Sequence, residues 1–142
     1  MSLVKSIVEA YQMKDKKRWD KLYFAIDLHG TIIKPGRLRY NIEVYPEAEK
    51  GLLFLNSIDH ITMILFTSTH KRNLTEFYQW CLNREIKIPY LNENPECAKE
   101  TLSGDYTKKF YYNVLIDDRA GFDYKTDWNI VIEVIRKILD AW

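Results

Sequence analysis

The chain has 142 residues, of which 46% are hydrophobic and 14% aromatic, so it can bury one hydrophobic core and is expected to form a single domain over residues 1–142. Its 21 lysine and arginine residues nearly balance its 20 acidic residues. Because these charges are mostly dispersed, the sequence indicates neither a nucleic-acid nor a membrane partner, and it leaves a small or locally anionic substrate open.

The composition also bears on cellular location. No apolar segment reaches the roughly 18 residues that a membrane-spanning helix needs, and the N-terminus lacks the apolar core of a signal peptide. Cys81 and Cys97 fit neither a zinc site nor a disulfide framework, so both are expected to be reduced thiols. We therefore expect a cytoplasmic protein.

The first expected element is an amphipathic helix over residues 4–20, where apolar side chains recur at near-helical spacing. Short apolar runs rich in β-branched or aromatic residues follow and predict strands. These runs cover residues 22–26, 61–66, 86–91 and 111–116. Because they lack polar alternation, they predict strands that are covered on both faces.

Helical patterns separate the expected strands at residues 47–57 and 71–85, and a last one covers 128–141. The polar segment 92–108 contains Pro95 and Gly104 and predicts a loop with at most one helical turn. Alternating strands and helices predict an α/β fold: a Rossmann-like three-layer domain with a mainly parallel central sheet.

Polar residues follow three of the four expected strands. Asp27, His29 and Gly30 come after the first run, Thr67 and Ser68 after the second, and the pair 117–118 after the fourth. In an open parallel sheet, ligands bind beyond the carboxyl ends of the strands. These side chains are therefore expected to converge on one point.

Asp27, Asp117 and Asp118 would supply the hard oxygen ligands that Mg²⁺ prefers. Three neighbouring carboxylates repel one another and raise at least one pKa, so the arrangement calls for a cation or a basic side chain nearby. Lys109, eight residues before Asp117, is the candidate basic neighbour, although Lys108 is adjacent and the sequence does not choose between them.

A phosphate site is expected beside the carboxylates. Gly30 permits a sharp turn that brings backbone amides close to an anion. Thr67 and Ser68 offer hydroxyl and amide donors at the start of the helix expected from residue 71, where phosphate is favoured. The same two residues can instead cap that helix, and Asp27 can instead cap its own turn, so these alternatives stay open.

The remaining polar and aromatic candidates have simpler interpretations. His60 and His70 are expected at the surface or in loops. The aromatic residues recur at core spacing, which favours packing over a stacking platform for bases. They include Phe110, Tyr111, Tyr112, Trp19, Trp80, Trp128 and Trp142.

Taken in order, the motifs resemble a known family. Asp-x-x-Gly-Thr at 27–31, Thr67, Lys109 and Asp-Asp at 117–118 follow one another as in the haloacid dehalogenase superfamily of phosphotransferases. The resemblance covers residues 22 to about 131. The strings NVLIDDRAGF and DWNIVIEVI are similar to a subgroup of small bacterial members without a cap domain.

The resemblance implies roles for these residues. Asp27 would attack phosphorus and form an aspartyl-phosphate, Thr67 would bind the phosphoryl group, and Lys109 would neutralise its charge. Asp117 would bind Mg²⁺ together with Asp27 and the main-chain carbonyl of His29, while Asp118 would support these ligands from outside.

His29 departs from the family pattern, since family phosphatases usually carry an acid/base aspartate at this position. An imidazole can in principle perform both proton transfers. Family members with a non-acidic residue here use altered chemistry or a slow second step, so His29 implies either a specialised or a weakened catalyst.

The spacing between the motifs leaves no room for a cap domain. By resemblance, members without a cap act on large substrates or borrow a lid from a neighbouring subunit, so a homo-oligomer stays open. Residues 32–46, with Arg37 and Arg39, are expected to form a small substrate lip.

The leading hypothesis is a Mg²⁺-dependent phosphohydrolase or phosphotransferase that acts on a phosphorylated substrate through Asp27. The alternative is a catalytically silent module of the same fold that binds metal or a phosphorylated ligand. A phospho-acceptor receiver domain fits less well, because its acidic pair precedes the acceptor aspartate, whereas here the pair follows it.

Overall fold

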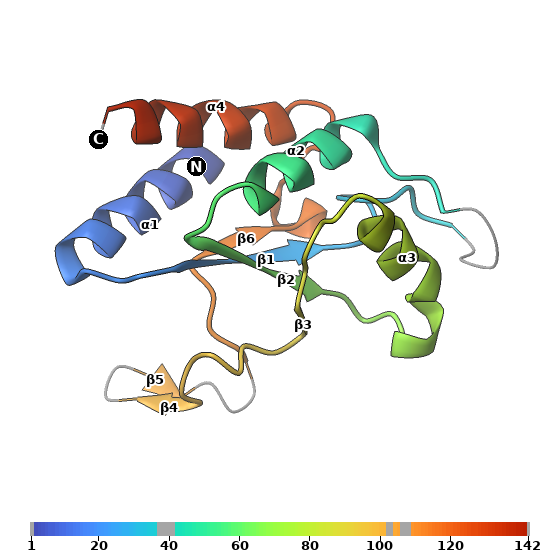
Figure 1. The fold of residues 1–142 in the computed structure, drawn as a ribbon, viewed down its shortest axis with the longest axis horizontal. Coiled ribbons are helices and arrows are strands. Elements are labelled where there is room, and N and C mark those ends of the chain that lie inside the picture. The colour runs from blue at the N-terminus through green and yellow to red at the C-terminus, as the bar shows by residue number, and fades with distance from the viewer. Residues whose placement is uncertain (1, 37–41, 102–103, 106–108, 142) are drawn as a thin grey trace.

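The computed structural model describes residues 2–36, 42–101, 104–105 and 109–141. Its centre is a four-stranded, all-parallel sheet with strand order β3-β2-β1-β6 (Figure 1). The strands are β1 Leu22–Asp27, β2 Ile61–Phe66, β3 Tyr90–Leu91 and β6 Val114–Ile116; the helices are α1 Leu3–Lys17, α2 Pro46–Asn56, α3 Thr75–Asn83 and α4 Asp127–Asp140. The predicted Rossmann-like α/β fold with a mainly parallel sheet is confirmed.

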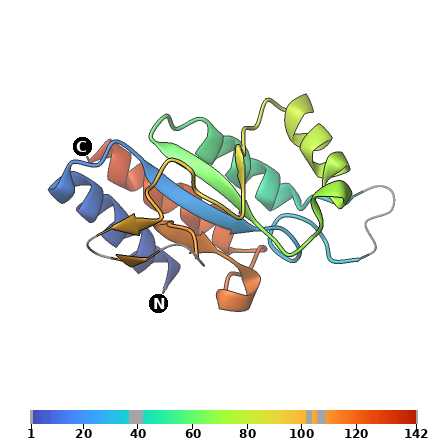
Figure 2. The ribbon, with the colours of Figure 1, turned by 90° about the horizontal axis from the view of Figure 1, so that it is seen from below.

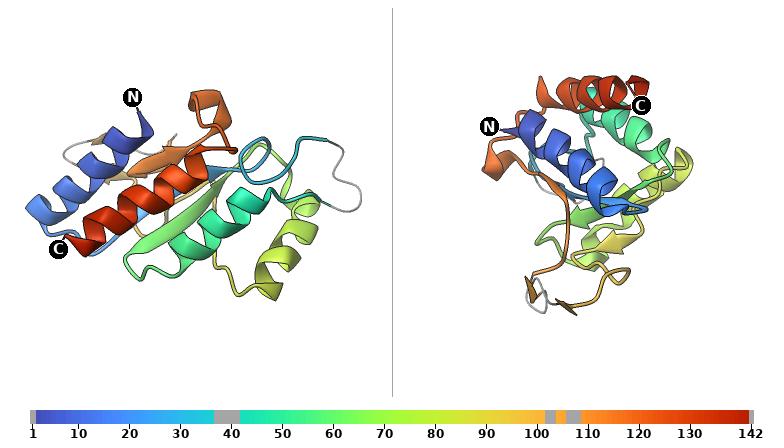
Figure 3. Two further views of the ribbon diagram at one scale, coloured as in Figure 1. Left: turned by 90° about the horizontal axis from the view of Figure 1, so that it is seen from above. Right: turned by 90° about the vertical axis from the view of Figure 1, so that its left-hand side faces the viewer.

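Helices α1, α2 and α4 lie together on one face of the sheet (Figures 1 and 3). Each of them turns apolar side chains into the core at helical spacing, such as Ile7 and Tyr11 of α1 and Val131 and Ile135 of α4. The expected N-terminal helix is present but stops at Lys17, because Arg18 adopts a left-handed conformation with φ 54°.

Trp128 joins this helical layer to the turn after β1. Its ring is fully buried against α2, and a Cβ added at Gly51 would collide with it. Its indole Nε1–H donates to the carbonyl of Thr31 at 2.9 Å. The helical layer therefore holds one of the loops at the carboxyl edge of the sheet.

The helix expected over residues 71–85 is interrupted. A 3-10 turn, η1, spans Lys71–Asn73 and is closed by the bond from the Leu74 amide to the Lys71 carbonyl at 3.1 Å. Helix α3 begins only after Leu74, whose side chain is buried in the core. The helix lies beside α2 (Figure 3), and Arg84 Nε is 3.5 Å from Glu49 Oε2. Thr67 and Ser68 consequently lie in the loop before η1, and the start of the helix is not next to them as expected. Neither residue caps a helix, so the alternative interpretation of the pair as helix caps was wrong.

Two strands are shorter than expected, for reasons in their own sequence. Pro89 cannot donate a backbone hydrogen bond, so β3 is reduced to Tyr90–Leu91. Before β6, the side-chain Oδ1 of Asn113 accepts from the backbone amide of Tyr23 at 2.7 Å. The backbone amide of Asn113 donates to the Tyr23 carbonyl at 2.8 Å. A side chain thus takes the place of a main-chain acceptor, and the ladder starts at Val114.

The described parts of the segment between β3 and β6 lie beneath the second face of the sheet (Figures 1 and 2). This segment carries an antiparallel pair, β4 Glu100–Thr101 and β5 Gly104–Asp105, where the sequence predicted a loop with at most one helical turn. The Glu96 carboxylate holds it to the sheet by accepting from Tyr90 Oη at 2.7 Å, Lys21 Nζ at 2.9 Å and Tyr23 Oη at 3.1 Å.

The described residues hold no further domain between these strands, in agreement with the expected lack of a cap. None of the helices in the described ranges is both long and apolar enough to cross a membrane. Cys81 and Cys97 are free thiols, as expected. His60 lies in the turn before β2 and pairs with Tyr11 Oη at 2.7 Å, and His70 is exposed in a loop.

Candidate functional site

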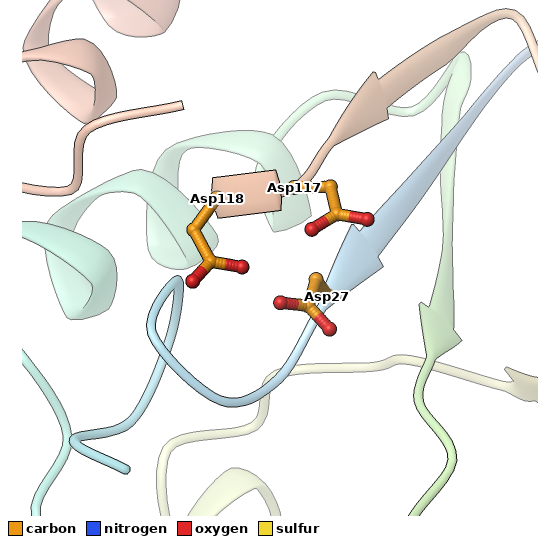
Figure 4. Close-up of side chains that lie close together, drawn as sticks. All are labelled: Asp27, Asp117 and Asp118. Atoms are coloured by element: carbon orange, nitrogen blue, oxygen red, sulfur yellow. The ribbon is translucent and has the colours of Figure 1, made fainter. Parts of the chain in front are cut away.

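Three carboxylates converge at the carboxyl edge of the sheet (Figure 4). Asp27 is the last residue of β1, Asp117 directly follows β6, and Asp118 opens the 3-10 turn η2, Asp118–Ala120. One oxygen from each lies within 4.8 Å of the others. They meet because β1 and β6 are parallel neighbours, so both strands end at the same edge.

A tight turn after β1 makes this approach possible. The Leu28 carbonyl accepts from the amides of Ile32 and Ile33 at 2.9 and 3.0 Å, and Gly30 adopts φ 81°. A Cβ at Gly30 would collide with the Asp118 carboxylate. Gly30 is therefore required both for the turn and for the close approach of Asp118.

The hydroxyl group of Thr31 links two of the carboxylate positions. It donates to Asp27 Oδ2 at 3.3 Å and accepts from the Asp118 amide at 3.1 Å, and the residue is fully buried. The sequence did not predict these two hydrogen bonds of Thr31, although the residue belongs to the Asp-x-x-Gly-Thr motif. The motif shows that a threonine is present, and the fold shows which groups it joins.

The environment of Asp27 raises the pKa of its carboxyl group to about 7. Burial is the largest cause, followed by the hydrogen bond to Asp118 and by the negative charges of Asp117 and Asp118, while a bond from the Leu28 amide opposes the shift. Within the described ranges, no ion pair involves any of the three carboxylates. The site therefore carries negative charge that a cation would balance.

The donor set fits Mg²⁺, which takes hard oxygen ligands and usually only one or two protein carboxylates. The main-chain carbonyl of His29, expected as a further ligand, accepts no backbone amide from the described chain. The residues that would hold the ion are thus Asp27, Asp117 and the His29 carbonyl, with Asp118 beside them.

The imidazole of His29 is half-buried at the same edge, with Nδ1 3.5 Å from Thr69 Oγ1, at the limit of a hydrogen bond. Burial lowers the pKa of His29, and the charge of Asp118 opposes this shift. At pH 7 the ring is therefore mainly neutral, so it is a better proton acceptor than proton donor.

Thr67 follows β2 directly and is only 8% exposed. The side chain of Asn92 clamps its backbone: Oδ1 accepts from the Thr67 amide at 2.9 Å, and Nδ2 donates to the Thr67 carbonyl at 2.7 Å. The Thr67 hydroxyl donates to Thr69 Oγ1 at 3.1 Å. Ser68 beside it is exposed. Asn92 fell within a predicted loop, and its role could not be found from the sequence.

Lys109 is exposed, and its Nζ lies 5.8 Å from the centre of the Tyr112 ring. The ion pairs within the described ranges do not include it. The neighbouring Phe110 ring packs against Phe66, 5.7 Å between centres, and Phe66 pairs in register with Asp27. The segment before β6 therefore reaches the carboxyl edge from beneath the sheet, but Lys109 does not contact the carboxylates.

The expected substrate lip is described only at its two ends. There the Lys34 amide donates to the Glu43 carbonyl and the Tyr45 amide to the Ile32 carbonyl, both at 2.9 Å, as in an antiparallel pair. Arg37 and Arg39, like Lys108, lie outside the described residues.

Comparison with known proteins supports the fold. No protein-family model and no curated protein matches the chain. The chain is similar to a solved structure of a conserved protein from Bacteroides thetaiotaomicron, with 28% sequence identity and a TM-score of 0.61 over 82% of this chain and 91% of that one. The class that fold and similarity define is a small Rossmann-like α/β protein, and its activity has to be inferred from the site.

Proposed function

We propose that the protein is a Mg²⁺-dependent phosphohydrolase or phosphotransferase in which Asp27 receives the phosphoryl group, as the resemblance to the haloacid dehalogenase superfamily implies. The observation that carries the proposal is the convergence of Asp27, Asp117 and Asp118 without a balancing ion pair in the described chain. Such a cluster is stable with all groups ionised only beside a cation.

In the proposed reaction, a carboxylate oxygen of Asp27 attacks phosphorus while the bond from phosphorus to the leaving oxygen breaks, and the leaving oxygen takes up a proton from water. The aspartyl-phosphate is then attacked by water, which releases phosphate and restores Asp27, or by an acceptor hydroxyl in a transferase. Mg²⁺, when bound, would neutralise charge on the phosphate and the carboxylates.

The other candidate site residues would bind phosphate, neutralise charge or transfer protons in this reaction. The hydroxyl of Thr67, with Ser68 and the backbone amides around Gly30, would bind the phosphoryl oxygens. Lys109 would approach from beneath the sheet to neutralise charge, which requires it to leave the Tyr112 ring. His29, neutral at pH 7, would accept a proton from the attacking water or acceptor hydroxyl.

The alternative, a silent module that binds metal or a phosphorylated ligand, is favoured by one observation. A mainly neutral His29 is a poor proton donor to the leaving group, and its ring makes only a long contact, with Thr69. Such a protein would bind Mg²⁺ at the same carboxylates without turnover.

A test is the release of 4-nitrophenol from 4-nitrophenyl phosphate with and without Mg²⁺. We expect turnover that Asp27→Asn and chelation both reduce by at least about a hundredfold, since each removes a group on which the chemical step depends. Asp59→Asn is the matched control, because Asp59 is an exposed carboxylate at the opposite edge, just before β2. Mg²⁺ binding without turnover in the wild type would favour the silent module.

The proposal includes a phosphorylated substrate as the partner and a cytoplasmic location, where two free thiols stay reduced. An open carboxyl edge without a cap is compatible with a large substrate or with a lid from a second copy of the chain.

A further inference from the structure

Phe66 stands in one row with the carboxylates across the sheet. It pairs in register with Asp27 on the neighbouring strand, and Asp27 and Asp117 directly follow Ile26 and Ile116, the last pair in register between β1 and β6. Asp117 is still in an extended conformation, with φ −151° and ψ 126°. Side chains in register on parallel strands point to the same face, so Phe66, Asp27 and Asp117 share one face at the carboxyl edge.

Phe66 is exposed although it belongs to the central sheet. In the described chain the exposed large hydrophobic side chains are Val4, Leu53, Phe66 and Leu82, and of these only Phe66 lies on a strand. It is 39% exposed, beside a neighbour, Leu65, that is fully buried. Because it is exposed, the Phe66 ring is available for contact with a bound molecule at this edge.

Further rings support Phe66 from beneath the sheet. Phe110 packs against it with 5.7 Å between ring centres, and Tyr112 follows with 5.6 Å to Phe110. Phe110 and Tyr112 are both half-buried, which holds the row of rings in place. The three residues form an aromatic strip that begins next to Asp27.

We propose that Phe66 and Phe110, the two rings of the aromatic strip that are nearest to Asp27, bind the leaving group of the substrate, and that the substrate is a phosphate ester of an aromatic alcohol. This inference rests on the proposed role of Asp27 as the phosphoryl acceptor.

The geometry of displacement supports this assignment. Adjacent strands lie about 4.8 Å apart, so Phe66 is one strand spacing from Asp27. A phenylalanine ring extends further from the backbone than an aspartate carboxylate, so the leaving group of a phosphate ester attacked by Asp27 would come within reach of the Phe66 ring. A flat apolar leaving group can pack on that ring, whereas a charged or strongly hydrated one gains nothing there.

The kinetic test compares two phosphoryl donors that differ in the leaving group, phenyl phosphate and acetyl phosphate, in the wild type and in Phe66→Ala. We expect Phe66→Ala to lower kcat/KM for phenyl phosphate roughly fivefold, as the loss of one aromatic contact implies, and to leave acetyl phosphate unchanged within about twofold. Phe66→Tyr should restore the value for phenyl phosphate. Leu82→Ala, which removes a side chain that is 69% exposed on α3, should change neither donor.

A binding test separates this inference from the proposed function, because it needs no turnover. With Mg²⁺ present, benzylphosphonate should bind the wild type about fivefold more tightly than methylphosphonate, and Phe66→Ala should abolish the difference. Equal binding of the two phosphonates, or an equal loss with both donors in Phe66→Ala, would overturn the aromatic strip even if Asp27 is phosphorylated. If the protein discriminates between the phosphonates but transfers no phosphoryl group, the aromatic strip binds aromatic groups and Asp27 is not a phosphoryl acceptor.

Discussion

The environment of Asp27 disfavours the ionised form of its carboxyl group. The pKa of its carboxyl is raised to about 7, because burial and the neighbouring Asp118 and Asp117 all act against ionisation. In the unfolded chain the same group would ionise near its ordinary value of 3.8. Without a cation, the folded protein therefore binds a proton on Asp27 between about pH 4 and 7 that the unfolded chain does not bind.

The contribution of Asp27 to the stability of the fold falls as the pH rises. Since the folded state binds more protons there, this group stabilises the fold at low pH, and its contribution is lost as the pH rises through 7. Asp27→Asn removes the effect. In chelator at pH 8 we expect the variant to exceed the wild type in free energy of unfolding by about 1 kcal/mol, a value discounted because Asp27 is only half-buried.

Urea unfolding at pH 5 and pH 8 measures this difference. The gap between Asp27→Asn and the wild type should widen from pH 5 to pH 8 and close when Mg²⁺ is added to the wild type. Asp59→Asn, at the opposite edge, should show no such widening. An equal difference in free energy of unfolding at both pH values would mean that ionisation of Asp27 does not destabilise the fold.

The carboxylate cluster could be predicted from the sequence, because each aspartate follows an apolar run and parallel strands end at one edge. The links between them could not. Thr31 lies four residues after Asp27 in a turn, and only the closed turn places its hydroxyl between Asp27 and Asp118.

At the scale of elements, the end of β2 depends on the chain beyond β3. Asn92 directly follows β3 and bonds both backbone groups of Thr67, which directly follows β2. It does so with φ 54°, a conformation that asparagine and glycine tolerate better than other residues. The position of Thr67 is therefore fixed by a neighbouring strand end.

Two substitutions separate the two contributions of Asn92. Asn92→Gly keeps the left-handed backbone but loses both hydrogen bonds to Thr67, so we expect a loss of about 1 kcal/mol in free energy of unfolding. Asn92→Ala loses the same bonds and adds backbone strain, for a further loss of about 1 kcal/mol. Urea unfolding of the two variants beside the wild type measures both losses. If glycine proved no less stable than asparagine, the clamp on Thr67 would contribute nothing.

The elements themselves were predictable where their periodicity is strong. The pattern over residues 128–141 gives α4 with a shift of one residue, Asp127–Asp140. Errors arose where one residue changes the hydrogen bonding, as Pro89 does in β3 and Asn113 does before β6. The interruption at residues 71–73 depends on Leu74 entering the core, which is a tertiary effect.

For the whole molecule, the alternation of strands and helices was enough to predict an α/β fold with a parallel sheet. It did not predict that described parts of the segment between β3 and β6 would lie over the second face (Figure 2), where Glu96 accepts hydrogen bonds from Tyr90, Lys21 and Tyr23. That layer brings the ring of Phe110 against Phe66 at the carboxyl edge. Long-range bonds between polar side chains have no periodic signature in a sequence.

We propose that Asp27 accepts a phosphoryl group at this edge of the sheet. The most direct measurement is a single-turnover reaction with an activated aryl phosphate and Mg²⁺, quenched in acid, with the phosphorylated residue located by mass spectrometry in the wild type, Asp27→Asn and His29→Asp. We expect a phosphoenzyme on Asp27 in the wild type, none in Asp27→Asn, and faster dephosphorylation in His29→Asp, where an aspartate supplies the usual acid/base group. If neither the wild type nor His29→Asp is labelled while both bind Mg²⁺, Asp27 is not a nucleophile and the protein acts as a binding module.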